Sequence, residues 1–244
     1  MPERAECQDG RVGAMVTFLQ RFCGPPDSAN GGYTAGTLAD FVHGPAEVTL
    51  RRAPPLDRPL TVDRVGDLVR LLDGEELIAD ASATTVDIET PAAVDFARAQ
   101  AATLSSPMRD RDRHPFPTCF ACGPDRHDND GLRLFAGRVP GTDLFATTWT
   151  PTETGTPIIW AALDCPSSAL IYLDDDAPPP HVLGRIAARI DREPGPGTPH
   201  VIMSWLLGRD GRKMFSGSAI YDADARVCAV ARATWIQLKP SPDT

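Results

Sequence analysis

Several features that mark other protein classes are missing from this sequence. No stretch of about 18 apolar residues runs uninterrupted, so no membrane-spanning helix is expected. The first residues, MPERAEC, are charged and contain no apolar core. They argue against a secretory signal, and we expect a cytoplasmic protein. Acidic residues outnumber basic ones by 33 to 24, for a net charge of −9. That balance disfavours nucleic acid and anionic membranes as partners.

The fingerprints of common catalytic and cofactor sites are also missing. The chain has no Gly-x-Ser-x-Gly elbow, no phosphate-binding glycine loop and no dinucleotide fingerprint, so we expect no cofactor. Cysteine is scarce, with six in 244 residues. Without an export signal, these cysteines indicate free thiols or a metal site rather than disulfides.

The sequence does contain enough apolar residues for a core, and many residues that form turns. Hydrophobic residues make up 42% of the chain, which also holds 24 prolines and 20 glycines. The length suits one large domain or two of roughly 120 residues each. This composition favours many turns and short strands.

Two pairs of short segments repeat each other. Residues 79–84 read ADASAT and residues 229–234 read AVARAT, with small residues alternating as in a strand that has one tightly packed face. Upstream, residues 37–40 (TLAD) resemble residues 161–164 (AALD). Chance in an alanine-rich chain is one explanation. The other is two copies of one fold, with a site where the copies meet.

Each half is expected to contain one buried helix followed by an antiparallel meander of strands. The helices are predicted at residues 33–42 and 157–173, and Pro166 should kink or shorten the second. Strands are predicted at residues 46–52, 60–65, 68–72 and 76–88, and again at 184–191, 200–208, 213–222 and 227–238.

This order of elements divides the chain into three parts. Residues 1–100 form a first copy, residues 101–131 a linker with a Cys-x-x-Cys loop, and residues 132–244 a second copy. A helix layered on an antiparallel sheet places the fold in the α+β class.

One short motif, together with this order, resembles a known family. Asn30-Gly31-Gly32 opens the first predicted helix, and Leu38 and Asp40 lie within it. The arrangement resembles the hot-dog fold thioesterases of the phenylacetate type, which have a similar step before a helix that carries the catalytic Asp. The resemblance implies a double hot-dog with two long central helices, each wrapped by an antiparallel sheet. It also implies hydrolysis of acyl-CoA (or acyl-carrier) thioesters where the two copies meet.

Thioester hydrolysis needs donors for the developing oxyanion and a carboxylate. The amides of Gly31 and Gly32, beside the cap residue Asn30, provide a helix N-terminus of the required kind, and a plain turn is the alternative. In hot-dog dimers the helix end and the carboxylate come from opposite subunits, so the resemblance pairs this end with Asp164 as base or nucleophile. Asp164 interrupts an apolar helix, where a charge is costly unless it is used. Asp40 is the candidate carboxylate for the reciprocal site.

Four further residues are candidates for holding the substrate. Arg51 and Arg52, at a strand end, are suited to the phosphates of coenzyme A, and a solvated strand edge is the alternative. Ser167 and Ser168 lie one turn beyond the candidate carboxylate and could orient a water or the thioester. Capping of the helix backbone near Pro166 is the alternative for both serines.

The loop at residues 114–131 contains Cys119 and Cys122, with His114 and His127 nearby. These four side chains are of the types that bind zinc. A single Cys pair in so short a proline-rich segment favours packing with free thiols, and a redox pair is a third alternative. We therefore expect no metal and a loop ordered by packing.

Three functions are consistent with these observations. The first is an acyl-thioester hydrolase, and the second is a non-catalytic protein that binds acyl-CoA or another acyl thioester. The third is a hydratase or dehydratase, which is disfavoured because neither predicted helix contains a His. Each takes a small-molecule acyl thioester on CoA or a carrier protein as its partner. The resemblance also allows a homodimer of double hot-dog chains.

Overall fold

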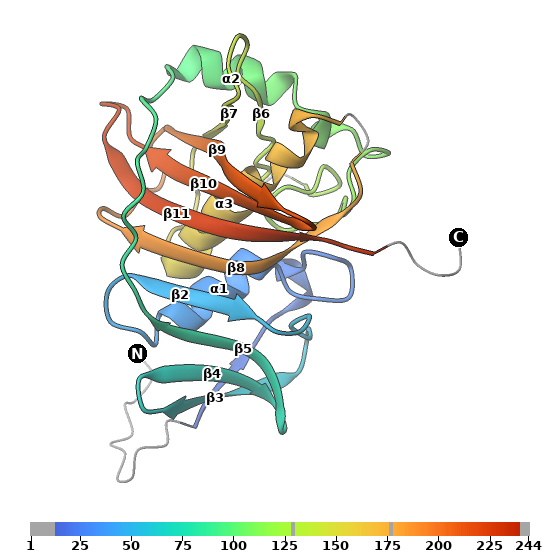
Figure 1. The fold of residues 1–244 in the computed structure, drawn as a ribbon, viewed down its shortest axis with the longest axis vertical. Coiled ribbons are helices and arrows are strands. Elements are labelled where there is room, and N and C mark those ends of the chain that lie inside the picture. The colour runs from blue at the N-terminus through green and yellow to red at the C-terminus, as the bar shows by residue number, and fades with distance from the viewer. Residues whose placement is uncertain (1–12, 128–129, 176–177, 240–244) are drawn as a thin grey trace.

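The computed structural model describes residues 13–127, 130–175 and 178–239. Its strands form one antiparallel sheet of 11 strands (Figure 1), in the order β1-β3-β4-β5-β2-β8-β11-β10-β9-β7-β6. The strands are β1 (Ala14–Thr17), β2 (Ala46–Leu50), β3 (Pro59–Val65), β4 (Leu68–Asp73), β5 (Glu76–Ala83), β6 (Gly137–Arg138), β7 (Phe145–Trp149), β8 (His181–Ile190), β9 (His200–Asp210), β10 (Lys213–Tyr221) and β11 (Val227–Gln237).

Two of the α-helices lie side by side against one face of this sheet (Figure 1). They and the sheet enclose the main hydrophobic core. The α-helices among the described residues are α1 (Gly31–Ala39), α2 (Phe96–Leu104) and α3 (Thr156–Ser168), and the short 3-10 turns are η1 (Gln20–Phe22), η2 (Pro107–Arg109) and η3 (Ala169–Leu173). The expected α+β class and the predicted helix and strand order are therefore present.

The two halves of the sheet join at β2 and β8, which pair over Ala46↔Ala188 to Thr49↔Arg185. This pairing makes the strands of the two halves one continuous antiparallel sheet. Without the pairing, β2 and β8 would each present an edge of unpaired backbone groups. Outward from the seam the order reads β2-β5-β4-β3-β1 on one side and β8-β11-β10-β9-β7-β6 on the other. Along the chain, α1 follows β1 in the first half, and α3 follows β7 in the second.

The repeated segments occupy matching places in this order. Residues 79–84 include the end of β5, beside β2, and residues 229–234 lie in β11, beside β8. Ala79 and Ala81 are fully buried, as are Ala229 and Ala231. Their small side chains face the layer that contains the two helices, so the helices pack close to the sheet.

The observed helix bounds correct two expectations. Helix α1 spans Gly31–Ala39, so Asp40 is its C-cap and lies exposed beyond the last turn rather than inside the helix. Helix α3 gives way to the 3-10 turn η3 two residues after Pro166, in keeping with the predicted shortening.

One helical stretch, Thr156–Leu173, is long and apolar enough to cross a membrane by length and composition alone. In the structure 72% of that stretch is buried inside the protein. Core helices pass the same test, so the stretch is weak evidence for a membrane span.

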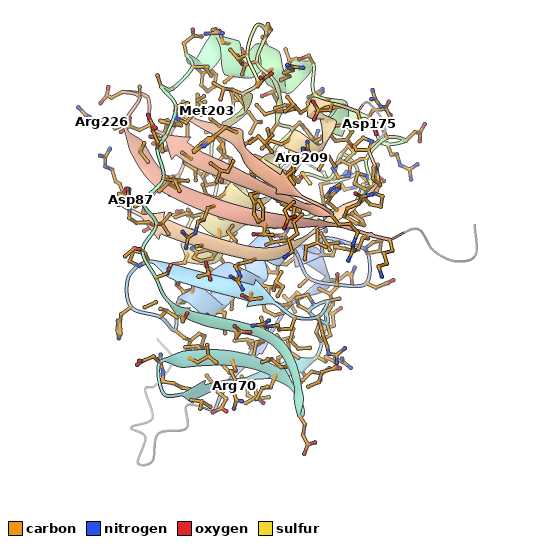
Figure 2. All side chains as sticks on the ribbon, in the orientation of Figure 1. Arg70, Asp87, Asp175, Met203, Arg209 and Arg226 are labelled. Atoms are coloured by element: carbon orange, nitrogen blue, oxygen red, sulfur yellow. The ribbon has the colours of Figure 1, made fainter. Side chains whose placement is uncertain are left out.

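Residues 84–95 cross from β5 to α2 over the opposite face of the sheet (Figure 1). Val86 and Val94 bury their side chains there in a second apolar cluster. The Val94 amide lies 3.3 Å from the Sδ atom of Met203. Met203 belongs to β9 (Figure 2). Helix α2 then packs on β6, β7 and β9. The second half of the sheet is thus covered on both faces, and α2 makes its contacts with that half.

Close contact between α1 and α3 depends on two glycines one turn apart. A Cβ atom added at Gly32 would lie 2.4 Å from the Cβ atom of Asp164, and one added at Gly36 would lie 2.6 Å from the Cα atom of Pro157. These distances are well inside van der Waals contact. The two helices therefore touch through bare backbone, antiparallel to each other.

The variant Gly36→Ala is expected to lower the free energy of unfolding by about 1–3 kcal/mol, because the new methyl group forces the helices apart. Alanine has a higher helix propensity than glycine. Helix propensity alone would therefore raise the free energy of unfolding. Urea denaturation measures the change. Gly13→Ala is the control, since a Cβ atom there meets nothing within 4 Å. Unchanged or increased stability in Gly36→Ala contradicts the packing argument.

Candidate active site

A cavity of about 390 Å³ opens where the N-terminus of α1 meets the middle of α3. This volume is within the range of small-molecule pockets. Its lining is mostly apolar. The apolar side chains that line it include Leu50, Met108, Phe116, Ile171, Val182, Leu183, Trp235, Ile236 and Leu238.

The start of α1 lines one side of this cavity through Asn30 and Gly31. The Asn30 side chain caps the helix as predicted, with its Oδ1 atom accepting a hydrogen bond from the Tyr33 amide at 2.9 Å. The Thr34 amide donates to the Asn30 carbonyl. The Gly32 amide donates to a carboxylate oxygen of Asp164 at 2.8 Å. Among the described residues, the Gly31 amide has no protein acceptor.

Asp164 lies in the middle of α3 and is only 1% exposed, yet it lines the same cavity. Its Oδ2 atom accepts the Gly32 amide, while its Oδ1 atom has no hydrogen-bond partner among the described residues. Burial raises the pKa of the Asp164 carboxyl well above its usual range, and the Gly32 amide opposes that shift by stabilising the charged form. An unpartnered buried carboxylate oxygen facing a cavity can accept a proton or a hydrogen bond from a ligand.

The structure does not bring Asp40 to this cavity. Asp40 is exposed at the C-terminal end of α1, and it is absent from the cavity lining. The predicted helix began and ended too late, at residues 33–42, and this error placed the carboxylate inside the helix.

The substrate-binding candidates divide into two pairs. Arg51 and Arg52 line the cavity and are half-exposed, but each is paired with a carboxylate, Asp80 at 2.5 Å and Glu76 at 2.7 Å respectively. The arginines therefore reach the cavity with their charge already partly balanced.

Both candidate serines cap the helix backbone, as the alternative interpretation had it. Ser167 Oγ donates to the Asp164 carbonyl and accepts a hydrogen bond from the Trp235 indole, and the residue is buried away from the cavity. Ser168 Oγ donates to the Cys165 carbonyl, although Ser168 does line the cavity.

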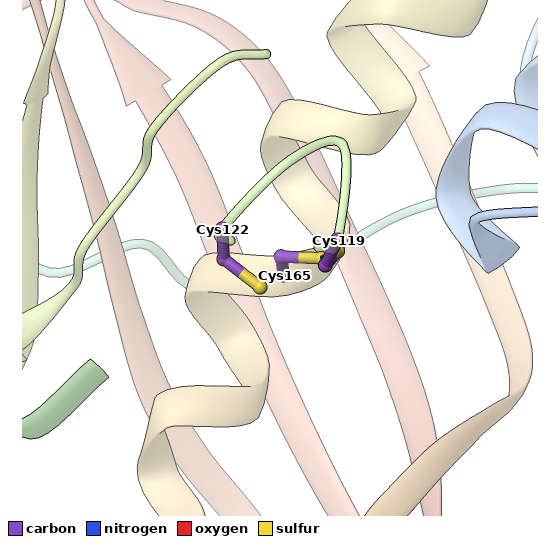
Figure 3. Close-up of side chains that lie close together, drawn as sticks. All are labelled: Cys119, Cys122 and Cys165. Carbon is purple, nitrogen blue, oxygen red and sulfur yellow. The ribbon is translucent and has the colours of Figure 1, made fainter. Parts of the chain in front are cut away.

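Three cysteine sulfurs converge in this cavity (Figure 3), and that of Cys165 lies 4.0 Å from the Oδ2 atom of Asp164. Cys119 and Cys122 come from the loop, and Cys165 comes from α3, with all three Sγ atoms within 4.8 Å of one another. The Asn30 side-chain amide lies 3.6 Å from the Cys119 sulfur and 3.3 Å from the Cys165 sulfur. Hydrogen bonds from the other two thiols lower the pKa of Cys119, and the pKa values of Cys122 and Cys165 are raised.

The two histidines of the loop lie in different environments. His114 is buried and lines the cavity, and its Nδ1 atom accepts the Phe116 amide at 3.0 Å. Its Nε2 atom is buried without a hydrogen-bond partner among the described residues. Burial lowers the pKa of His114 and favours the neutral ring. His127 is exposed and lies outside the cavity.

Sequence reasoning missed Cys165 as a member of this cluster. Cys165 follows Asp164 directly in α3. Its position next to the candidate carboxylate was the signal available in the sequence. The convergence itself depends on a contact 46 residues apart along the chain, which local pattern does not contain.

The loop is held in place by one aromatic anchor. Phe120, between the two loop cysteines, is fully buried. Its ring packs edge-on against those of Phe22 and Tyr33, with centroid distances of 5.0 Å and 5.7 Å. The backbone turn closes with a hydrogen bond from the Gly123 amide to the Cys119 carbonyl. A Cβ atom at Gly123 would lie 2.4 Å from the Pro117 carbonyl oxygen, so this turn needs glycine.

The variant Phe120→Ala is expected to lower the free energy of unfolding by about 3–5 kcal/mol, because it empties a fully buried aromatic site. Urea denaturation followed by tryptophan fluorescence measures the change. Phe96→Ala is the control, since Phe96 is 41% exposed and should lose much less. Equal losses in the two variants would show that Phe120 does not anchor the loop.

Comparison with known proteins gives matches in structure and none in sequence. No protein-family model matches the chain, and no curated protein matches it significantly. The pyran synthase domain from module nine of the sorangicin pathway has a TM-score of 0.64 at 12% identity, with 98% of each chain covered. A conserved protein of unknown function with a hot dog fold, from Alicyclobacillus acidocaldarius, has a TM-score of 0.63 at 11% identity, with 97% of each chain covered.

An acyl-CoA thioesterase also matches. The acyl-CoA thioesterase II TesB2 from Mycobacterium marinum has a TM-score of 0.54 at 12% identity, covering 89% of this chain and 92% of that one. At these identities the likeness establishes the fold. The chain has a hot-dog fold over nearly its whole length, and its structural neighbours include thioesterases.

Proposed function

We propose that this chain hydrolyses acyl thioesters, carried by CoA or a carrier protein, at a single site between its two halves. The observation that supports this most directly is the pairing of Asp164, from α3, with the start of α1 in one apolar cavity. A carboxylate and a helix N-terminus from different halves are the two parts that thioester hydrolysis needs.

We further propose that the halves are two copies of one hot-dog unit, with residues 1–100 and 132–244 as the copies and residues 101–131 as the linker. The matching strand order on the two sides of the β2–β8 seam supports the duplication. The matching places of α1 and α3 in chain order support it as well. Helix α2, which spans the proposed boundary at residue 100, packs on β6, β7 and β9.

The mechanism follows from the contacts of the two helices. The substrate's carbonyl oxygen accepts a hydrogen bond from the Gly31 amide at the positive end of α1. The Gly32 amide holds Asp164 in position rather than binding the substrate, since its proton is already donated to that carboxylate. Asp164 acts as base on a water or as the nucleophile. As a base, Asp164 takes a proton from water while the water oxygen bonds to the carbonyl carbon; the C–S bond then breaks, and the proton passes from Asp164 to the departing thiolate. As a nucleophile, a carboxylate oxygen of Asp164 displaces the thiolate and forms an acyl anhydride, which water then hydrolyses to the free acid, regenerating Asp164 and supplying the proton of the thiol.

The reciprocal site lacks both parts. Asp40 is exposed, and α3 begins with Gly155 as N-cap and Pro157 in its first turn, which carries no amide proton. Bulky Ile158 and Ile159 follow directly. We therefore assign one working site to the chain and give Asp40 no catalytic role.

Two other functions fit parts of the same geometry. A non-catalytic acyl-thioester binding protein would keep the cavity and release no thiol. A hydratase or dehydratase draws support from His114, which shares the cavity with Asp164. Against it, neither α1 nor α3 contains a His.

The variant Asp164→Asn is expected to reduce thioester turnover roughly 10²–10⁴-fold, the usual contribution of acid–base catalysis, with little change in substrate affinity. Release of free thiol from a panel of acyl-CoA esters measures the rate. Asp40→Asn is the matched control and should retain nearly full activity. Full activity in Asp164→Asn removes that residue from the mechanism.

The wild-type panel separates the three functions. Binding without thiol release favours the binding protein. A change in the enoyl absorbance of the acyl-CoA without thiol release favours the hydratase or dehydratase, provided that the variant His114→Gln no longer gives this change.

The double variant Arg51→Ala and Arg52→Ala is expected to raise KM for acyl-CoA roughly tenfold, because two charge-assisted contacts to phosphates are lost. KM for acyl-pantetheine, which lacks the nucleotide phosphates, should not change. Steady-state kinetics on both substrates measure the difference. Arg58→Ala is the control, since Arg58 pairs with Asp73 and does not line the cavity. Equal KM changes for both substrates would remove these arginines from phosphate binding.

A further inference from the structure

The cysteine cluster has a geometry that the proposed hydrolysis does not use. The Cys119 and Cys165 sulfurs are 3.7 Å apart, and the Cys122 sulfur lies within 4.8 Å of both. A tetrahedral zinc ion with Zn–S bonds of about 2.3 Å holds its sulfur ligands about 3.8 Å from one another. The three buried thiols are thus placed close to the spacing of metal ligands.

We propose that Cys119, Cys122 and Cys165 bind one thiophilic divalent ion, zinc in the first place, with its fourth coordination position facing the cavity. On binding, the three thiols release three protons to solvent, and three metal–sulfur bonds form. No oxidation or reduction is involved, and the site does not require that the chain hydrolyse thioesters.

A side-chain N–H donor lies beside two of the three sulfurs. The Asn30 amide group points an N–H donor at both Cys119 and Cys165. Hydrogen bonds of this kind orient metal ligands and offset their negative charge. The Cys-x-x-Cys turn, closed by Gly123, presents two sulfurs from one short loop, which is a common arrangement at structural zinc sites. Cys165 adds a third ligand from a rigid helix.

Neither neighbouring polar side chain supplies the fourth ligand as placed. His114 accepts the Phe116 amide at Nδ1, so its neutral ring carries the proton on Nε2 and cannot bind a metal there. One oxygen of Asp164 is held by the Gly32 amide, and this carboxylate lies outside the set of converging ligand atoms. All three cysteines line the cavity, so a water or a ligand from that side completes the coordination.

This proposal revises the expectation of no metal that the sequence favoured. That expectation rested on a single Cys pair, with His114 and His127 as the other candidate ligands. The third cysteine comes from α3 instead, which removes the strain of fitting every ligand into one short loop.

A disulfide is the competing use of these cysteines. It would join two of the sulfurs, leave the third as a lone buried thiol, and need an oxidant. The metal uses all three, and it ties the loop to α3 directly beside Asp164.

The test begins with protein purified under reducing, chelator-free conditions. Elemental analysis is expected to find one zinc per chain. After metal removal, titration with Co²⁺ should give the near-ultraviolet charge-transfer absorption of cobalt–thiolate bonds, saturating at one equivalent. Protons released during the titration should approach three per chain at a pH where the apo thiols are protonated.

Variants then assign the ligands. Cys165→Ser should lose the bound metal at a chelator concentration that wild-type protein withstands, and Cys119→Ser and Cys122→Ser should do the same. Cys228→Ser is the matched control, a buried cysteine on β11 outside the cluster, and it should keep one metal per chain. His114→Ala should also keep its metal.

Several results would overturn the proposal. These are apo wild-type protein with reduced thiols that takes up neither zinc nor cobalt, full metal binding in Cys165→Ser, or a disulfide among the three cysteines in anaerobically purified protein. Loss of metal in His114→Ala would overturn the assignment of three protein ligands. If a Ser variant fails to fold, the Co²⁺ titration of wild-type protein still tests the proposal. Thiol release from acyl-CoA, assayed separately, decides the hydrolase function on its own.

Discussion

The hydrogen bond from the Gly32 amide to the Asp164 carboxylate is the contact on which the rest of the site depends. It forms only because α1 and α3 touch through Gly32 and Gly36, where any side chain would collide with the facing helix. The bond joins the start of one helix to the middle of the other. This contact fixes the start of α1 against α3, and so it positions the Gly31 amide and Cys165 at the cavity.

Asn30 connects that contact to the cysteine loop. Its side-chain oxygen caps α1, while its side-chain nitrogen reaches two sulfurs on different elements. The aromatic anchor Phe120 holds the other end of the arrangement, packed against Tyr33 in the first turn of α1. Catalytic candidates and cysteines therefore share one support, and a shift of the α1 terminus would move both.

Features set by local sequence could be predicted, and features set by distant contacts could not. Alternation of small residues predicted β5 and β11, and the Asn-Gly-Gly step predicted the capped start of α1 to within two residues. The identification of Asp164 rested on a charge within an apolar run, and that residue does line the cavity. The β2–β8 seam was missed, because the pairing of two edges depends on strands far apart in the chain. Cys165 was missed for the same reason.

The covalent joining of the two halves has a consequence for how such a site can change over time. In a symmetric dimer of identical subunits every substitution appears twice, so each subunit must carry both the glycine-rich helix start and the buried carboxylate. In one chain, each part is needed only once. The first helix can keep its glycines and leave Asp40 in solvent, while the second keeps Asp164 and begins with proline and isoleucine. On the proposed duplication, one chain can therefore divide the two parts between its halves, which a pair of identical subunits cannot do.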